Sequence, residues 1–352
     1  MQSCLDNIYV LNKSYQTVGV IDFASSIIWT KKYYEIGDFE IYAPATDKAI
    51  ALLQEGFYLV RTDCDMVGII ENISLTTDAE SGNWLTVTGR DAKSILERRI
   101  VWEQTNLYGT AANGIITLLN NNIISAAEER KISNFTATAP NPAIFTDKLE
   151  KQITGKNLYE SILAICQEFH YGSKVTLNNG TFNFELYKGV DRAVSQAANP
   201  HVVFSPEYEN FLSSEYSLET TNYRNVALVA GEGEGKTRVT QTVGTASGLD
   251  RYEIYVDSRN TSSNDGEITE SEYANLLIAE GQETLASNVK TETFEGNINS
   301  GRTYEYNSDY FLGDIVTMRN EFGMQKDVRI IEVIESLDEN GLTITPSFED
   351  RM

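Results

Sequence analysis

The chain has 352 residues, long enough for two or three domains, and 41% of them are hydrophobic, which suffices for an ordinary core in each. Its formal net charge is −23, with acidic residues spread along the chain, which speaks against a surface that grips phosphate backbones. Three widely spaced cysteines and two histidines leave little material for a disulfide framework, a zinc site or an imidazole base, and weigh against most hydrolases.

Neither a membrane span nor a secretory signal is predicted. The longest apolar runs, such as residues 115–119, are far shorter than the roughly 20 residues that cross a bilayer. The N-terminus lacks a basic segment followed by an apolar one. We therefore expect a folded, soluble protein that is synthesised in a cytoplasm and has neither a metal site nor a cofactor.

Short runs that alternate apolar and polar residues fill the first hundred residues and predict strands. These runs lie at residues 8–11, 17–21, 39–42, 57–60, 67–70 and 84–88. A helix is predicted at residues 47–55, with Thr46 as its N-cap and Gly56 as its stop. A second short helix at residues 91–99 closes this unit, capped by Asp91.

The middle of the chain has a different character. Helical spacing at residues 111–124 and 158–169 predicts two helices with one buried face each. A hairpin follows at residues 174–188, where Asn179 and Gly180 suit a two-residue type I′ turn. The sequence therefore predicts a small α+β domain here, and the polar residues 195–200 are its predicted linker to the last third of the chain.

Strand patterns return in the last third, at residues 225–229, 238–241 and 252–256. One long helix follows, and Thr269 and Glu272 mark its start at the spacing of a capping box. The remaining residues, 310–348, are again rich in strand patterns.

An internal repeat is the most informative pattern. Gly37-Asp38 and Gly313-Asp314 each lie between hydrophobic residues and suit a tight turn before a strand. Further matches follow in the same order: residues 69–73 with 330–334, the acidic turns 78–82 with 338–341, and residues 85–88 with 342–345. The alternative is that any two β-meanders look alike. We take the ordered matches to indicate two similar units.

The predicted fold is therefore mainly β with an α+β insertion. Two β-barrel-like tube domains, at residues 1–104 and 201–352, flank a smaller α+β domain at residues 105–200. The second tube domain contains the long helix. Gly37, Asp38, Gly313 and Asp314 are the predicted structural turns of the repeat; no catalytic, cofactor-binding or metal-binding residue is predicted.

Three motifs that resemble ligand-binding sites are interpreted as turns or helix caps. Residues 231–237 end in Gly-Lys-Thr like a phosphate-binding loop, but Ala230 occupies the first glycine position and a strand pattern follows, so a turn between strands fits better. Residues 264–272 resemble a calcium loop only faintly, and the capping box explains them better. Asp63 and Asp65 lie between strand patterns and are interpreted as a solvated turn.

Segments with a family pattern occur in a fixed order along the chain. They are Trp29 with residues 34–44, then 68–73, 88–91 leading to 95–99, 225–235, 251–259 and 310–316. On these segments the chain resembles the siphophage tail-hub family, and it is similar to the N-terminal part of tail-associated lysins and to hub proteins of contractile tails. The resemblance covers most of the chain.

The resemblance implies a homotrimeric ring in which each chain gives two tube-like β domains, so that three chains present six similar units to a sixfold tail tube. Implied partners are further copies of the chain, distal-tail or tail-tube proteins, and tail-tip, spike or fibre proteins. DNA passes through the channel without specific binding, and acidic walls repel its phosphates. The implied location is the virion tail, assembled in the host cytoplasm, with no enzymatic activity and no lysin module.

Two alternatives stay open at this point. The hub of a phage-tail-like bacteriocin or another injection machine would share the fold without carrying DNA. A carbohydrate-active protein of the cell wall would use two of the many carboxylates, or the nineteen tyrosines, on a sugar surface.

Overall fold

The computed structural model describes residues 8–80, 82–263, 267–298, 303–322 and 324–350. Strands make up 41% of it and helices 20%, which confirms the prediction of a mainly β protein. None of the helices in these ranges is long and apolar enough to cross a membrane.

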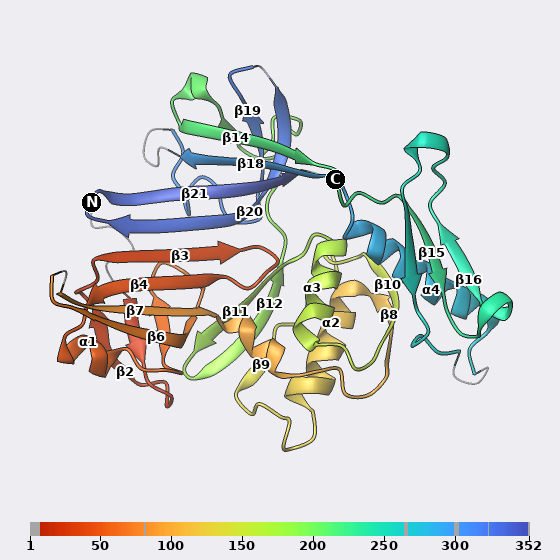
Figure 1. Cartoon of the computed structure of the whole chain (residues 1–352), viewed down its shortest axis with the longest axis horizontal. Coiled ribbons are helices and arrows are strands. Elements are labelled where there is room, and N and C mark those ends of the chain that lie inside the picture. Colours follow the sequence, from red (N-terminus) through yellow and green to blue (C-terminus); the bar gives the residue numbers. More distant parts are fainter. Residues whose placement is uncertain (1–7, 81, 264–266, 299–302, 323, 351–352) are drawn as a thin grey trace.

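Strands from both ends of the chain form a single large sheet. The N-terminal unit supplies β1 (Ile8–Leu11), β2 (Thr17–Ile21), β3 (Ser26–Lys32), β4 (Asp38–Pro44), β5 (Tyr58–Arg61), β6 (Gly68–Asp78) and β7 (Gly82–Asp91). The C-terminal unit supplies β13 (Val203–Phe204), β14 (Phe211–Glu219), β18 (Thr291–Ile298), β19 (Ile315–Arg319), β20 (Gln325–Asp338) and β21 (Gly341–Asp350). Figure 1 shows the two sets of strands lying side by side.

The order of the strands decides what kind of sheet this is. It runs β14-β18-β21-β20-β3-β4-β7-β6-β5-β1-β2, and β19 with β13 pairs beside β20 to complete thirteen strands. The end strands of this order, β14 and β2, do not pair with each other, so the described strands form no closed barrel. This corrects the expectation of barrel-like domains: both units contribute to one open sheet, because an edge of one unit pairs with an edge of the other.

The two predicted helices of the N-terminal unit are confirmed. Helix α1 (Asp47–Leu52) begins where Thr46 accepts a hydrogen bond from the amide of Ala49 at 3.2 Å. The second is the 3₁₀ helix η2 (Ala92–Arg98), in which the Asp91 carboxylate accepts from the amide of Lys93 at 2.7 Å.

The middle of the chain is α+β, as predicted. It contains β8 (Thr105–Thr110), α2 (Ala111–Leu119), the π-helical turn η3 (Asn120–Ile124), β9 (Phe135–Ala137), β10 (Lys148–Ile153), α3 (Leu158–Glu168), β11 (Gly172–Asn178) and β12 (Thr181–Tyr187). The β11–β12 hairpin turns at Asn179 and Gly180, whose φ angles of 49° and 76° are those of a type I′ turn.

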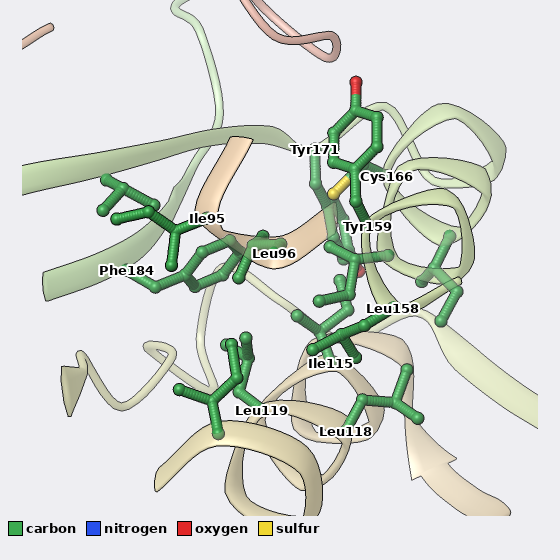
Figure 2. Close-up of a cluster of buried hydrophobic side chains, with 14 of the residues drawn as sticks. Ile95, Leu96, Ile115, Leu118, Leu119, Leu158, Tyr159, Cys166, Tyr171 and Phe184 are labelled. Carbon is green, nitrogen blue, oxygen red and sulfur yellow. The ribbon is translucent and has the colours of Figure 1, made fainter. Parts of the chain in front are cut away.

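One core joins this middle part to the N-terminal unit. Figure 2 shows Ile95 and Leu96 of η2 gathered with Leu118 of α2, Leu158 of α3 and Phe184 of β12. Burial of these side chains stabilises the fold by roughly 1.5–3 kcal/mol for each. Because η2 belongs to the first unit and the others do not, the middle part is held against the large sheet by a shared apolar core.

A small lobe is inserted between β14 and β18. It consists of the strands β15 (Val226–Ala230), β16 (Thr240–Val243) and β17 (Glu253–Asp257) with helix α4 (Glu270–Ala286), and it lies at one end of the molecule in Figure 1. The predicted capping box of α4 is present, with Thr269 and Glu272 each accepting from the backbone of the other. Gly281 lets α4 approach the sheet closely, since a Cβ there would lie 2.6 Å from Val243.

Candidate assembly surfaces

The β3–β20 seam is the line where the two units meet. The C-terminal half of β20 pairs antiparallel with β3, in a register that runs from Glu332 opposite Lys32 to Leu337 opposite Ile27. Strand β20 also pairs with β21 over nearly its whole length, and its N-terminal half pairs with β19. The backbone of β20 therefore has neighbours on both sides along the seam.

Buried charges cross this seam. The Glu335 carboxylate, nearly inaccessible to solvent, accepts from Lys31 Nζ at 2.6 Å and from the Arg61 guanidinium. Arg61 also binds Asp63 in a second ion pair. Burial alone lowers the pKa of Arg61, but the carboxylates of Asp63 and Glu335 outweigh it and raise the pKa. The network thus links β20 to β3 and β5, and removal of any one of these charged groups would leave an unpaired buried charge and destabilise the fold.

A cavity of about 450 Å³ opens beside the seam, between the two units and the middle domain. Its charged walls include Lys31, Lys93 and Lys174, all of which bind carboxylates or carbonyl oxygens of the protein. Cys64 also lines it, and burial raises the pKa of its thiol. The paired state of the lysines leaves the cavity without an evident ligand group.

The three motifs of the sequence lie as follows. Residues 231–237 join β15 to β16, with the short 3₁₀ helix η5 (Gly235–Thr237) between them, so they form a turn between strands as expected. Residues 264–266 of the calcium-like stretch lie outside the described residues. Asp63 and Asp65 form ion pairs with Arg61 and Lys174, and no cluster of potential metal ligands occurs in the described part of the chain.

Many of the aromatic residues serve packing. Tyr33, Tyr171 and Tyr310 are among the largest fully buried side chains, and Trp29 is buried against Phe39 at 5.5 Å between ring centroids. This use of the aromatic residues gives the carbohydrate alternative no support.

The predicted turn residues lie at two different places. Gly37 precedes β4, and its amide donates to the Asp91 carboxylate at 2.7 Å, while Asp38 is the exposed first residue of that strand. Gly313, at φ 94°, precedes β19. Asp314 accepts from the amide of Val190 at 2.7 Å and pairs with Arg192. The structure does not bring the two pairs together.

A second likeness between the units appears in hydrogen bonds that the sequence patterns did not indicate. The amide of Gly56 donates to the carbonyl of Ile70, whose own amide donates to Phe57. In the C-terminal unit, the amide of Gly313 donates to the carbonyl of Ile330, whose amide donates to Asp314. By this backbone pattern Gly313 corresponds to Gly56, and β19 corresponds to β5. Both glycines have a left-handed φ, and the signal that the sequence offered was a glycine two residues before each strand.

The hairpins β6–β7 and β20–β21 also share an irregularity. Each has a bulge in its first strand, at Glu71 in β6 and at Ile331 in β20. The bulge lies equally far from the last paired residue before the turn, which is Asp78 in one hairpin and Asp338 in the other. The registers of the two hairpins therefore superimpose residue by residue from the turn.

Beyond its bulge, β6 differs from β20 in what lies beside it. Strand β5 pairs with β6 only at Gly68 and Ile69, so among the described strands residues 72–77 have β7 as their single neighbour. On this edge Ile73 is 38% and Leu75 is 55% exposed. Such an edge with apolar side chains is a surface suited to strand pairing.

Strand β14 is the other edge of interest. It ends the strand order of the large sheet, and β18 is its single partner among the described strands. Tyr216 and Leu218, on this strand, are 39% and 50% exposed. Among the described strands, β6 and β14 thus each present an edge with exposed apolar residues, one in each unit.

Comparison with known proteins identifies the family. A family profile described as siphovirus ReqiPepy6 Gp37-like protein matches residues 7–348. The chain belongs to this family. No curated protein matches the Gp37-like chain by sequence.

Solved structures share the fold of this Gp37-like protein. The tail protein from Neisseria meningitidis MC58 is similar with a TM-score of 0.58 and 14% sequence identity, over 98% of this chain and 96% of that chain. The 43 kDa tail protein of prophage MuSo2 from Shewanella oneidensis has a TM-score of 0.60 and 11% identity, over 98% of both chains. The fold is that of phage tail proteins, which confirms the resemblance inferred from the sequence.

The fold also occurs within a larger chain of the Francisella PdpA–VgrG complex. The TM-score is 0.51 at 11% identity, over 98% of this chain and 52% of that chain. The Gp37-like chain therefore spans about half the length of that neighbour.

Proposed function

We propose that the Gp37-like chain is a structural hub of a siphophage tail that assembles as a homotrimeric ring. In this ring, three chains supply six similar units around a channel. The observation that carries the proposal is the join of two units edge to edge in one sheet, with an apolar edge left at β6 and another edge at β14. A chain built in this way can repeat its internal junction between copies until a ring closes.

The units support this proposal by their likeness. Corresponding hairpins have the same bulge position, and corresponding glycines before β5 and β19 make the same backbone hydrogen bonds. In the proposed arrangement the tube-like units are residues 1–104 and 201–352, and residues 105–200 form the insertion. The ring faces a sixfold tail tube on one side and tip, spike or fibre proteins on the other.

The charge of the chain suits a conduit for DNA. With a formal net charge of −23, the ring would carry three times this excess of negative charge. Acidic walls repel phosphates, so DNA passes without adhering, and the protein needs no catalytic residue for this role. The place of action is the virion tail, after assembly in the host cytoplasm.

The test is the mass and symmetry of the purified protein across a range of concentrations, by light scattering and negative-stain averaging. A threefold particle with a central hole is expected. Antibody labelling of purified tails gives the second readout, and label at the tail tip is expected. Tails that lack the protein would contradict the hub role, whatever the mass in solution.

A second candidate, the hub of an injection machine that carries no DNA, is favoured by the fold shared with part of the Francisella PdpA–VgrG complex. The proteins encoded beside the gene distinguish the two. Capsid and terminase genes in the same operon support the phage hub, whereas their absence supports the injection machine.

A further inference from the structure

We propose that the edge of β6 at residues 72–77 pairs antiparallel with β14 of a second copy of the chain, in the register that β20 uses with β3 inside each chain. This inference rests on the proposed hub function and assigns the contact that closes the ring. The two units have corresponding strands, but among the described strands only one of the two corresponding junctions is filled within a chain.

The first correspondence is between β6 and β20. Both strands end a hairpin arm at an aspartate, Asp78 or Asp338, and both have the bulge at the same distance from it. Counted back from the turn, Ile73 therefore corresponds to Val333 and Leu75 to Glu335. Val333 and Glu335 are buried by β3 and its neighbours, whereas Ile73 and Leu75 are exposed.

The second correspondence is between β14 and β3. Strand β18 pairs with β21 in the same way as β4 pairs with β7. Position 294 of β18 lies opposite Phe348, and Phe39 of β4 lies opposite Gly89, the residue of β7 that corresponds to Phe348. Strand β14 then pairs with β18 as β3 pairs with β4, with Tyr216 opposite position 294 and Trp29 opposite Phe39. Tyr216 accordingly corresponds to Trp29, and Leu218 corresponds to Lys31.

The register of the β3–β20 seam now predicts the contact between copies. In the seam, Val333 lies opposite Lys31 and Glu335 lies opposite Trp29. When this register is applied to the edges of β6 and β14, Ile73 of one copy lies opposite Leu218 of the next copy. By the same step, Leu75 lies opposite Tyr216.

This register has two favourable chemical consequences. It places all four exposed apolar side chains of these edges against one another, so that each is covered by a partner of its own kind. It also places Glu215 opposite Thr76 and Glu219 opposite Asn72, so that no two acids face each other across the contact. A shift by one residue would turn the apolar side chains to opposite faces of the sheet.

The proposed β6–β14 contact between copies thus has apolar side chains at the positions where the β3–β20 seam within the chain has charged ones. Glu335, with Lys31 and Arg61, is replaced by Leu75 with Leu218 near it. An apolar contact forms from exposed edges without leaving buried charges unpaired in the free chain, which suits a junction that is made only on assembly.

The first test uses cysteines at the predicted pair. The double variant Ile73→Cys with Leu218→Cys is treated with a short bifunctional thiol reagent, and products are separated under denaturing conditions. Opposed Cβ atoms in an antiparallel pair are about 5 Å apart, so a covalent ladder that ends at three chains is expected. The matched control is Thr77→Cys with Leu218→Cys, whose Cβ atoms are roughly 13 Å apart in the same register. It should give at least about tenfold less product.

The second test measures assembly without cross-links. Leu75→Glu is expected to raise the concentration at which half of the protein is assembled by at least about tenfold, because it buries an unpaired charge in the contact. Val18→Glu is the control, since Val18 is 46% exposed on the other edge strand, β2, and lies outside the contact. It should leave assembly unchanged.

The outcomes separate this inference from the hub function. A particle that assembles without the Ile73–Leu218 product overturns the proposed register and leaves the hub role intact. A chain that stays monomeric at every concentration overturns self-pairing through these edges, while labelling of purified tails decides the hub role independently. Cross-linking of the control pair with equal yield would also overturn the register.

Discussion

The hairpins β6–β7 and β20–β21 have the same register and the same bulge, yet their surroundings are opposite. Residues 332–337 of β20 are covered by β3, and a carboxylate is buried among them at Glu335. Residues 72–77 of β6 are exposed, and apolar side chains stand there at Ile73 and Leu75. The local structure of a strand therefore does not decide whether its edge is paired; the neighbouring strand available in the fold decides it.

The largest expected effect is at the covered hairpin. Glu335→Ala should lower the free energy of unfolding by about 3–5 kcal/mol, because it leaves Lys31 and Arg61 buried beside no carboxylate. Chemical denaturation of the monomeric protein measures it. Glu332→Ala, which removes a more exposed pair with Lys32 at 3.3 Å, is the matched control and should cost about 1 kcal/mol or less. Equal losses for the two variants would contradict a special role of the buried network.

Corresponding apolar positions of the two hairpins should respond differently. Val333→Ala removes buried methyl groups and should cost about 2 kcal/mol, whereas Ile73→Ala should change the stability of the monomer by less than about 0.5 kcal/mol. Thermal unfolding at concentrations below assembly compares them. A large loss at Ile73 in the monomer would mean that its edge is covered within the chain.

The glycines that close the two hairpins should respond alike to substitution. Gly82 and Gly341 have φ angles of 88° and 108°, and neither would have a Cβ in contact with another residue. Gly82→Ala and Gly341→Ala should therefore each cost roughly 1 kcal/mol through backbone strain alone. Unequal losses in denaturation would show that the loops of different length, with three residues between Asp78 and Gly82 and two between Asp338 and Gly341, strain these glycines differently.

The smallest expected effect concerns pH, at the contact of the C-terminal unit with the middle domain. Tyr34 lies 3.1 Å from His170 Nδ1 and also donates to the Glu349 carboxylate. Burial lowers the pKa of His170, and Arg329 and Lys188 lower it further against the opposing charge of Asp147. The folded state therefore binds fewer protons there, and this contribution to stability is lost as the pH falls from about 6.5 through the folded-state pKa.

Unfolding measured from pH 7.5 to pH 5 tests this sign, with His170→Gln as the comparison. The variant should lose less stability than the parent chain over this window. The neighbouring Glu349 acts in the opposite direction, since burial raises its pKa, and its contribution to stability is lost as the pH rises through that pKa. A steeper loss on acidification in His170→Gln than in the parent would contradict the assignment to this histidine.

Local features of the fold were predictable from the sequence because they depend on neighbouring residues. Thr46, Asp91 and Thr269 cap helices where their spacing indicated, and Asn179-Gly180 makes the predicted hairpin turn. Gly281 is unfavourable inside helix α4 by propensity, and the reason for its presence is tertiary: the close approach of α4 to Val243. A propensity scale evaluates the helix alone and not the surface on which it packs.

The arrangement of the candidate surfaces was harder to predict. The matched residues 69–73 and 330–334 lie in strands that do correspond, but the shared bulge aligns residues 69–73 with 329–333, one residue away from the match made on the sequence. Gly313 aligns by its hydrogen bonds with Gly56 and not with Gly37. A Gly-Asp turn before a strand is a short signal that many strands share. Only the pairing partners of the following strand distinguish β4 from β5.

What the sequence determined by itself is many of the strands, the helix caps, the hairpin turn at Asn179-Gly180, the acidic charge and the resemblance to tail proteins, since each depends on residues close together along the chain. Strands β3, β14 and β18 were not predicted. What only the tertiary structure decided is which edges meet. The charges of Lys31, Arg61 and Glu335 come together from β3, β5 and β20, and nothing in the neighbourhood of any one of them indicates the other two. Edge pairing uses backbone groups that every residue has, so its choice of partner depends on the whole fold.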